Sequence, residues 1–253
     1  MIGIDMRWLL EKPIAHRGLH DAPSGVPENS LAAFEAALRA GFPFELDVRL
    51  LSDGAVVVFH DESLLRLSGV DAPISAQDSR TLRSFRLSGT DHGIPLLADV
   101  LDLVRGRVGV LIEIKNFAHP GALERSVLET IRGYDGPFAV QSFNPFSMAW
   151  FAERSPDVVR GHLAGDFAGL AIAGTTGDAL RRLEHTGASR PHYIGLDIRC
   201  LPFDRIEAER LRGRPIIGWT VRSAAEKDHA LRWCDNIIFE GFRSGVPSSS
   251  PDC

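Results

Sequence analysis

Three acidic residues in the first half of the chain have the spacing of a metal site. Glu45 and Asp47 are two positions apart in an apolar run, so on a β-strand both side chains face the same way. Glu113 lies in a later apolar run. Converging carboxylates repel one another unless they are protonated or neutralised by a cation, and an all-oxygen ligand set suits Mg²⁺ or Ca²⁺, with Mn²⁺ also compatible. The sequence therefore predicts one divalent ion bound by Glu45, Asp47 and Glu113; the alternative is ordinary solvated carboxylates.

Two of the nine histidines, His16 and His60, each end an apolar run near these acidic residues. Histidine titrates near neutral pH, so a pair can supply both a base and an acid. Phosphodiester cleavage needs both, because the nucleophile must lose a proton and the leaving alkoxide must gain one. We predict that His16 and His60 are this pair and interpret the other histidines as structural.

Five further residues are candidates for substrate contact. Arg17 and Lys115 are cations that could stabilise charge on phosphoryl oxygens, or could form salt bridges with neighbouring carboxylates. Asn29 precedes a predicted helix and is either a helix cap or a site residue. Phe143 and Trp219 follow or end later strands and either line the pocket or belong to the core.

The elements that must position these residues alternate between strand-like and helical runs, which predicts a parallel sheet covered by helices. The strand-like runs are Ile14–His16, Phe44–Leu50, Ala55–His60, Val108–Ile114, Phe138–Ser142, Val158–Leu163, Tyr193–Ile198, Ile216–Val221 and Asn236–Phe239. The helical runs are Ser30–Ala40, Leu97–Arg105, Gly121–Gly133, Phe146–Glu153, Gly177–Thr186, Asp204–Leu211 and Ala224–Trp233.

One pair of strand-like runs is too close in sequence to be parallel. Only Leu51–Gly54 separates Phe44–Leu50 from Ala55–His60, whereas parallel neighbours need a crossover of about a dozen residues. Asp-Gly is a hairpin turn signal. The sequence thus predicts an α/β fold, a (β/α)8 TIM-type barrel with a β-hairpin excursion after the second strand. A small insertion, residues 62–95, follows over the barrel mouth, where the strand ends place active sites in such barrels.

The composition fits one globular domain. Apolar residues make up 44% and charged residues 24% of the 253 residues, which predicts a single catalytic domain over 1–243 and a disordered polar tail at 244–253. The net charge is -5 without a basic stripe, so nucleic acid is not an expected partner. No transmembrane segment or signal peptide is predicted, and three widely spaced cysteines indicate the cytoplasm. Nothing in the sequence specifies an oligomeric state.

The motifs IAHRG, PENS, FELDV, SDGAVVVFHD, LIEIK, VQSF and GWTV, in this order, resemble glycerophosphodiester phosphodiesterases, which are phospholipase C-like TIM-barrel enzymes. The resemblance implies hydrolysis of small glycerophosphodiesters, such as deacylated phospholipids, to sn-glycerol 3-phosphate and an alcohol, with a cyclic phosphate through the glycerol 2-hydroxyl as an intermediate. It implies an insertion after the HD motif. The family's catalytic histidines match His16 and His60, its metal ligands Glu45, Asp47 and Glu113, and its phosphate-contacting residues Arg17 and Lys115.

The chain departs from the family pattern in three places. Ser30 stands in PENS where threonine is usual, and LLRLSGV follows the HD motif in place of the usual pattern. After the last strand the chain reads NIIFEGF, whereas relatives commonly have an IITD-like ending. Phe239 and Glu240 are bulkier and change the expected pocket wall.

Two alternative functions stay open. A lysophospholipase D or sphingomyelinase D would need an apolar rim near the mouth, for which Leu64, Leu65 and Leu67 are candidates unless they form the core of the insertion. A non-catalytic phosphate-ester-binding barrel would bind its ligand with metal but without turnover.

Overall fold

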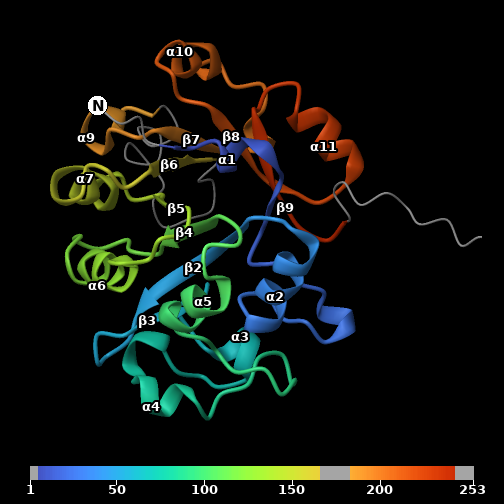
Figure 1. The fold of residues 1–253 in the computed structure, drawn as a ribbon, viewed down its shortest axis with the longest axis vertical. Coiled ribbons are helices and arrows are strands. Elements are labelled where there is room, and N and C mark those ends of the chain that lie inside the picture. The colour runs from blue at the N-terminus through green and yellow to red at the C-terminus, as the bar shows by residue number, and fades with distance from the viewer. Residues whose placement is uncertain (1–4, 166–182, 243–253) are drawn as a thin grey trace, which may run out of the picture.

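Eight parallel strands form one closed hydrogen-bonded circuit in this computed structural model, which describes residues 5–165 and 183–242 (Figure 1). The order around the circuit is β1-β9-β8-β7-β6-β5-β4-β2, and β1 pairs again with β2. The strands are β1 (Ile14–Ala15), β2 (Phe44–Leu50), β4 (Val110–Ile114), β5 (Phe138–Ser142), β6 (Arg160–Ala164), β7 (Tyr193–Asp197), β8 (Ile216–Val221) and β9 (Asn236–Phe239). The predicted TIM-type barrel is confirmed.

Helices surround the barrel. They are α1 (Trp8–Glu11), α2 (Leu31–Ala40), α5 (Leu97–Val104), α6 (Ala122–Ile131), α7 (Pro145–Arg154), α9 (Thr186–Ser189), α10 (Ile206–Leu211) and α11 (Ala224–Ala230). The predicted helix Gly177–Thr186 lies largely outside the described residues, and the predicted tail 244–253 lies wholly outside them. Within the described ranges, no helix is both long and apolar enough to cross a membrane.

The ninth strand, β3 (Val56–Val58), runs antiparallel to β2 and lies outside the circuit. Val48 faces Val58 and Leu50 faces Val56 across this hairpin. At the turn, the Ala55 amide donates to Asp53 Oδ1 at 3.2 Å. The short spacing between β2 and β3 therefore gives the predicted excursion.

The insertion that follows β3 has a small core of its own. It contains α3 (Leu65–Ser68) and α4 (Ser79–Leu82), and its buried cluster includes Leu64, Leu67, Ile74, Leu82, Leu87 and Ile94. Alternate residues of the hairpin join the two cores, since Val57 packs in the insertion while Val58 packs against the barrel. Leu64 and Leu67 are thus core residues of the insertion, whereas Leu65 is 55% exposed.

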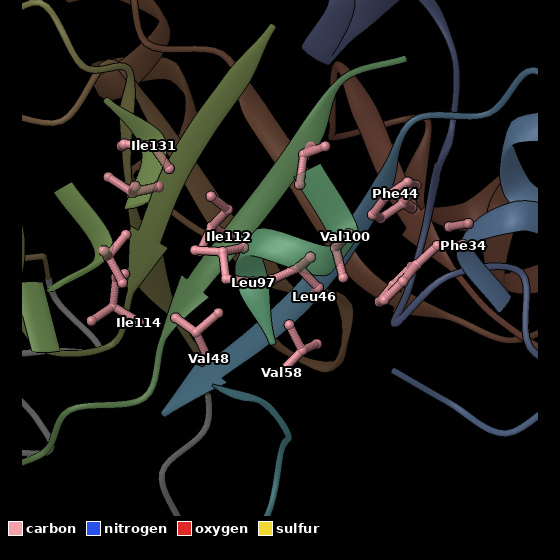
Figure 2. Close-up of a cluster of buried hydrophobic side chains, with 14 of the residues drawn as sticks. Phe34, Phe44, Leu46, Val48, Val58, Leu97, Val100, Ile112, Ile114 and Ile131 are labelled. Carbon is pink, nitrogen blue, oxygen red and sulfur yellow. The ribbon is translucent and has the colours of Figure 1, made fainter. Parts of the chain in front are cut away.

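The layer between strands and helices is apolar and positions the strands. Figure 2 shows this cluster, in which Phe44, Leu46 and Val48 of β2 lie among residues of α2, α5 and β4. Phe34 of α2 stacks on Phe44 with ring centroids 4.5 Å apart. Because side chains alternate along a strand, this outward packing turns Glu45 and Asp47 into the barrel.

The lower part of the barrel interior is also apolar. Its cluster contains Leu9, Ile14, Leu111, Ala139, Val159, Tyr193, Ile217 and Ile238. Helix α1 packs at this end, where the Asn236 amide donates to the carbonyls of Leu9 and Lys12, each at 2.7 Å. This end of the barrel is filled, and space for a ligand lies at the carboxyl ends of the strands.

Candidate active site

A cavity of about 410 Å³ opens at the carboxyl ends of the strands. Eight of the ten predicted site residues line it: His16, Arg17, Glu45, His60, Glu113, Lys115, Phe143 and Trp219. The other two, Asp47 and Asn29, lie directly behind this wall and are almost fully buried. The strand register sets the arrangement, since Asp47 of β2 pairs with Glu113 of β4.

The three carboxylates form a compact buried group. Glu45, Asp47 and Glu113 each offer an oxygen within 4.8 Å of the others. One oxygen of each, Glu45 Oε1, Asp47 Oδ1 and Glu113 Oε1, accepts no hydrogen bond from the described residues. Lys115 Nζ forms ion pairs with Asp47 Oδ1 at 3.1 Å and with Glu113 Oε1 at 2.6 Å, whereas Glu45 Oε1 has no polar partner among the described residues. A buried oxygen without a partner is costly, and a hard cation would satisfy it.

The titration of this group points the same way. Burial raises the pKa of Glu45 well above its ordinary value, and the charges of Asp47 and Glu113 add to the rise. Burial also raises the pKa of Glu113, although Lys115 opposes it. Burial acts on Asp47 as well, but Lys115 and Arg17 outweigh it and hold the pKa of Asp47 far below its usual range. A divalent ion would relieve this repulsion by displacing protons, so the residues fit a metal.

Each histidine has a carboxylate on its Nδ1 atom. Glu240 Oε2 makes a short contact with His16 Nδ1, and Asp61 Oδ1 lies 2.6 Å from His60 Nδ1. With Nδ1–H donating to the carboxylate, Nε2 of each ring is left to exchange protons. Burial lowers the pKa of both histidines, and the carboxylates on Nδ1 oppose this shift. The net shift is downward for both histidines, so each ring holds its second proton less tightly than an ordinary histidine.

Arg17 links the three carboxylates to the wall of the cavity. Its backbone amide donates to Glu45 Oε2 at 3.0 Å, its NH1 donates to Glu28 Oε1 at 2.7 Å, and its Nε lies 3.2 Å from Asp47 Oδ2. The salt bridges considered for Arg17 and Lys115 are thus present, and both side chains also face the cavity. The next residue, Gly18, has φ +81°, and a Cβ there would lie 2.8 Å from Ala33 Cβ, so only glycine fits.

Asn29 contacts the carboxylate group directly. Its Nδ2 donates to Asp47 Oδ2 at 2.9 Å, and its backbone amide donates to the carbonyl of Arg17 at 3.0 Å. The helix cap is the next residue, Ser30, whose Oγ accepts from the Ala33 amide at 3.1 Å. The alternative of Asn29 as a cap is therefore wrong. Asn29 and Arg17 both have positive φ, and such strained backbone is typical of functional sites.

Phe143 and Trp219 form an aromatic wall of the cavity, with ring centroids 5.4 Å apart in an edge-to-face arrangement. Trp219 Nε1 is buried and has no hydrogen-bond partner among the described residues. It is a donor available to a ligand.

Sequence reasoning placed Glu240 in the pocket wall without its contact to His16, and it missed Gln141. Glu240, which follows β9, contacts His16, lies 3.6 Å from His20 Nε2, and accepts from Arg222 Nε at 2.6 Å. Gln141 of β5 lines the cavity beside Glu113 and accepts from the Tyr193 hydroxyl at 3.1 Å. The signal for both was the period-two alternation, which puts them two residues beyond inward-facing Ile238 and Ala139.

Comparison with known proteins gives a consistent picture. The sequence pattern described as the glycerophosphoryl diester phosphodiesterase family matches residues 16–240. A glycerophosphodiester phosphodiesterase of Bacillus altitudinis is 35% identical over 162 residues, which are 59% of this chain and 64% of that protein. The chain thus spans just under two thirds of that relative.

Two further similarities are to a human protein and to a solved bacterial structure. A human lysophospholipase D is 32% identical over 140 residues, or 50% of this chain and 42% of that protein. An Oleispira antarctica phosphodiesterase, solved with its product sn-glycerol-3-phosphate, superposes with a TM-score of 0.74. That match is 22% identical and covers 92% of this chain and 93% of the other, so it shows a shared fold.

Proposed function

This chain belongs to the glycerophosphoryl diester phosphodiesterase family, and on that basis we propose that it hydrolyses glycerophosphodiesters to sn-glycerol 3-phosphate and a free alcohol. The observation that carries the proposal is the pairing, at one cavity, of two carboxylate-backed histidines with three buried carboxylates whose oxygens lie within 4.8 Å of one another. Glu45, Asp47 and Glu113 would hold one divalent ion, Mg²⁺, Ca²⁺ or Mn²⁺. When bound, the ion supplies positive charge to the phosphoryl oxygens.

The chain's own residues would divide the remaining work. Arg17 and Lys115 hold phosphoryl oxygens and balance the charge that develops on them. One histidine accepts the proton of the attacking hydroxyl, from water or the glycerol 2-hydroxyl; where the 2-hydroxyl attacks, water opens the resulting cyclic phosphate in a second step, in which the two histidines exchange roles. The phosphorus bond to the leaving oxygen breaks, and the other histidine gives that oxygen a proton. Glu240 and Asp61 keep the two rings in the tautomer that presents Nε2.

Asn29, Phe143 and Trp219 would shape the site. Asn29 fixes the carboxylate of Asp47 through its amide, so it acts on the metal group. The apolar faces of Phe143 and Trp219 suit the carbon skeleton of the glycerol moiety, and the buried Trp219 Nε1 suits one of its hydroxyls.

The test is release of sn-glycerol 3-phosphate from glycerophosphocholine and glycerophosphoethanolamine, with EDTA or with Mg²⁺, Mn²⁺ or Ca²⁺. We expect EDTA to stop turnover and one ion to restore it. In Glu45→Gln, the concentration of ion that restores turnover should rise sharply. An unchanged ion response would remove Glu45 from the ligand set, and no turnover with any ion would contradict the proposed reaction.

A lysophospholipase D activity is a second candidate because an aromatic residue lies exposed at the cavity. Phe117 lines the cavity and is 54% exposed, and Phe146 at the start of α7 is 55% exposed. Such residues could contact an acyl chain, whereas of the leucines first considered only Leu65 is exposed. Turnover of lysophosphatidylcholine that falls in Phe117→Ser, with glycerophosphocholine turnover kept, would favour this activity. Tight metal-dependent ligand binding without any turnover would instead indicate a binding protein.

We also propose that the chain works in the cytoplasm on small molecules. Cys234 is a free thiol. A cysteine outside any disulfide suits a reducing compartment. Fractionation of cells that express the tagged chain would test the location.

A further inference from the structure

A second cavity, of about 360 Å³, adjoins the catalytic cavity on the side of the insertion. The two share a wall, because the side chains of Arg49 and Lys115 line both. The floor and far wall come from Ile74 of the insertion and Leu123 of α6. We call this second cavity the side groove. It offers room next to the phosphate position that the proposed reaction leaves unassigned.

Arg49 is the residue that gives the side groove its chemistry. It is the third inward-facing member of β2, two residues beyond Asp47, and its side chain is only 14% exposed. Its Nε donates to the carbonyl of His60 at 2.8 Å, which fixes the plane of the guanidinium. The side groove therefore lies on the His60 side of the catalytic cavity.

The rest of the Arg49 guanidinium lacks a close anion. Its nearest carboxylate within the described chain is Glu62, with Oε1 3.9 Å from NH1, and the Glu62 side chain is 80% exposed. Arg17 and Arg66, by contrast, have carboxylate oxygens at 2.7 and 2.6 Å. A largely buried guanidinium is costly without a partner, and its planar fork suits a carboxylate.

The wall of the side groove opposite Arg49 is fixed and does not compete for it. Asn116 donates to Glu124 Oε1 at 2.8 Å and accepts from the Ala118 amide at 2.9 Å. Glu124 is fully buried and also accepts from the Gly121 amide at 2.7 Å. Since these groups satisfy one another and Lys115 is paired with Asp47 and Glu113, Arg49 is the cation of the side groove without a close carboxylate, and Glu62 is its acidic residue.

We propose that the side groove binds the leaving alcohol of the substrate, and that it favours an alcohol that carries both a carboxylate and an ammonium group, as in glycerophosphoserine. The carboxylate meets Arg49, and the ammonium meets Glu62 at the exposed rim. Choline or ethanolamine would leave Arg49 without an anion, and a purely anionic alcohol would meet Glu62 unfavourably. This inference rests on the proposed phosphodiesterase activity.

The experiment compares glycerophosphoserine with glycerophosphoethanolamine, because these two substrates differ by a single carboxylate. We expect kcat/KM to favour the serine compound about 10-fold or more, as a charge-assisted hydrogen-bonded pair warrants. In Arg49→Gln this ratio should fall towards one, and in Arg49→Lys, which keeps the charge without the fork, it should be intermediate. A wild-type ratio near one, or a ratio that survives in Arg49→Gln, would overturn the proposal.

Two controls separate the groove from general charge effects. Glu62→Gln removes a contact common to both ammonium groups, so both rates should fall while their ratio stays. Arg39→Gln changes an exposed charge on α2 and should leave both rates and the ratio unchanged. A ratio that moves as much in Arg39→Gln as in Arg49→Gln would reduce the effect to net charge and overturn the assignment.

Binding provides a readout that does not need turnover. Both compounds are titrated calorimetrically into His16→Ala, with the working metal ion present. The preference should appear as about a 10-fold difference in Kd and vanish when Arg49→Gln is added. If the wild-type chain hydrolyses no substrate but this difference in Kd is present, the proposed reaction is wrong and the binding preference of the side groove is kept. If hydrolysis is normal and the difference in Kd is absent, only the proposed preference of the side groove is wrong.

Discussion

The lower and upper layers of the barrel interior are built on the same strands, yet they differ in almost every physical respect. On β4 the inward side chain changes from Leu111 in the apolar cluster to Glu113 in the carboxylate group within two residues. On β1 it changes from Ile14 to His16 over the same spacing. One pleat of about 6.6 Å thus separates packing from chemistry.

The two layers also differ in how well their polar groups are satisfied. In the lower layer Asn236 donates to two carbonyls, and none of its buried side-chain atoms lacks a hydrogen-bond partner. In the upper layer Glu45 Oε1 and Trp219 Nε1 are buried without hydrogen-bond partners in the described part of the chain. The packed lower layer stabilises the barrel. This stability offsets the cost of the unsatisfied polar groups in the upper layer, which a bound ligand would satisfy.

Replacing a histidine of the upper layer should give the largest effect. We expect His16→Ala or His60→Ala to lower kcat about 10²- to 10⁴-fold, because each removes one of the two proton transfers. The midpoint of thermal unfolding should stay close to wild type. His229→Ala, on the exposed side of α11, is the matched control and should leave both quantities unchanged. Near-normal turnover in either site variant would remove that histidine from the mechanism.

Replacing Leu111 in the lower layer should have the opposite pattern. Leu111→Ala leaves a cavity in a fully buried position and should reduce the free energy of unfolding by about 2–5 kcal/mol, measured by urea denaturation. The kcat per folded molecule should be retained. Glu113→Gln, two residues along β4, should instead lose activity with little loss of stability, because it removes a charge that the fold holds at a cost. If both variants lost stability equally, the division between the two layers would be wrong.

The sequence predicted the barrel because its signals are local. Alternation along Phe44–Leu50 and the turn Asp53-Gly54 each act within a few residues, and both match the structure. Predicted strand ends lie within two residues of the observed ones. The positions of the carboxylates followed from the same alternation, since outward packing of Leu46 leaves Glu45 and Asp47 inside.

The sequence did not predict the contact between Glu240 and His16, because this contact depends on closure of the barrel. Glu240 contacts His16 across 224 positions because β9 pairs with β1, and no local pattern names that partner. The role of Asn29 could not be separated from that of a cap, since Asn29 and Ser30 are adjacent and both are good capping residues. Only the strand geometry shows that Asn29 faces Asp47.

Acid pH should destabilise the fold through His162, a buried histidine of β6 that is not one of the two proposed catalytic histidines. His162 is fully buried on β6, and its Nδ1 lies 3.1 Å from Ser189 Oγ, with no carboxylate paired to it within residues 5–165 and 183–242. Burial, with smaller contributions from His185 and Arg214, lowers the pKa of His162 to about 4. Between about pH 6.5 and 4 the unfolded chain binds a proton at this histidine that the folded chain does not bind, so stability falls as the pH is lowered.

The titration of His162 should lower the free energy of unfolding by about 3 kcal/mol between pH 6.5 and 4, measured by urea denaturation at several pH values. His162→Leu removes the titrating group. The slope of its free energy of unfolding against pH should therefore be smaller than that of wild type by the equivalent of close to one proton, whatever the variant's stability at pH 7. His192, whose pKa is also lowered to about 4 by burial, keeps a similar slope in both proteins. Equal slopes in wild type and His162→Leu would contradict the assignment.

Replacing Glu240 should give the smallest effect on activity, because Glu240 contacts Nδ1 of His16 and acts through that ring. Its contact with Nδ1 opposes the effect of burial and supports the pKa of His16. In Glu240→Gln we expect kcat to fall about 10-fold, as for other partners that orient a functional histidine, and the limb of the pH–rate profile that reports His16 to move to lower pH. Glu240→Asp should retain much of the rate and the position of that limb, because a carboxylate remains beside the ring. A structural role alone would lower the rate without moving the limb, so an unmoved limb in Glu240→Gln would show that Glu240 only fills the space next to His16.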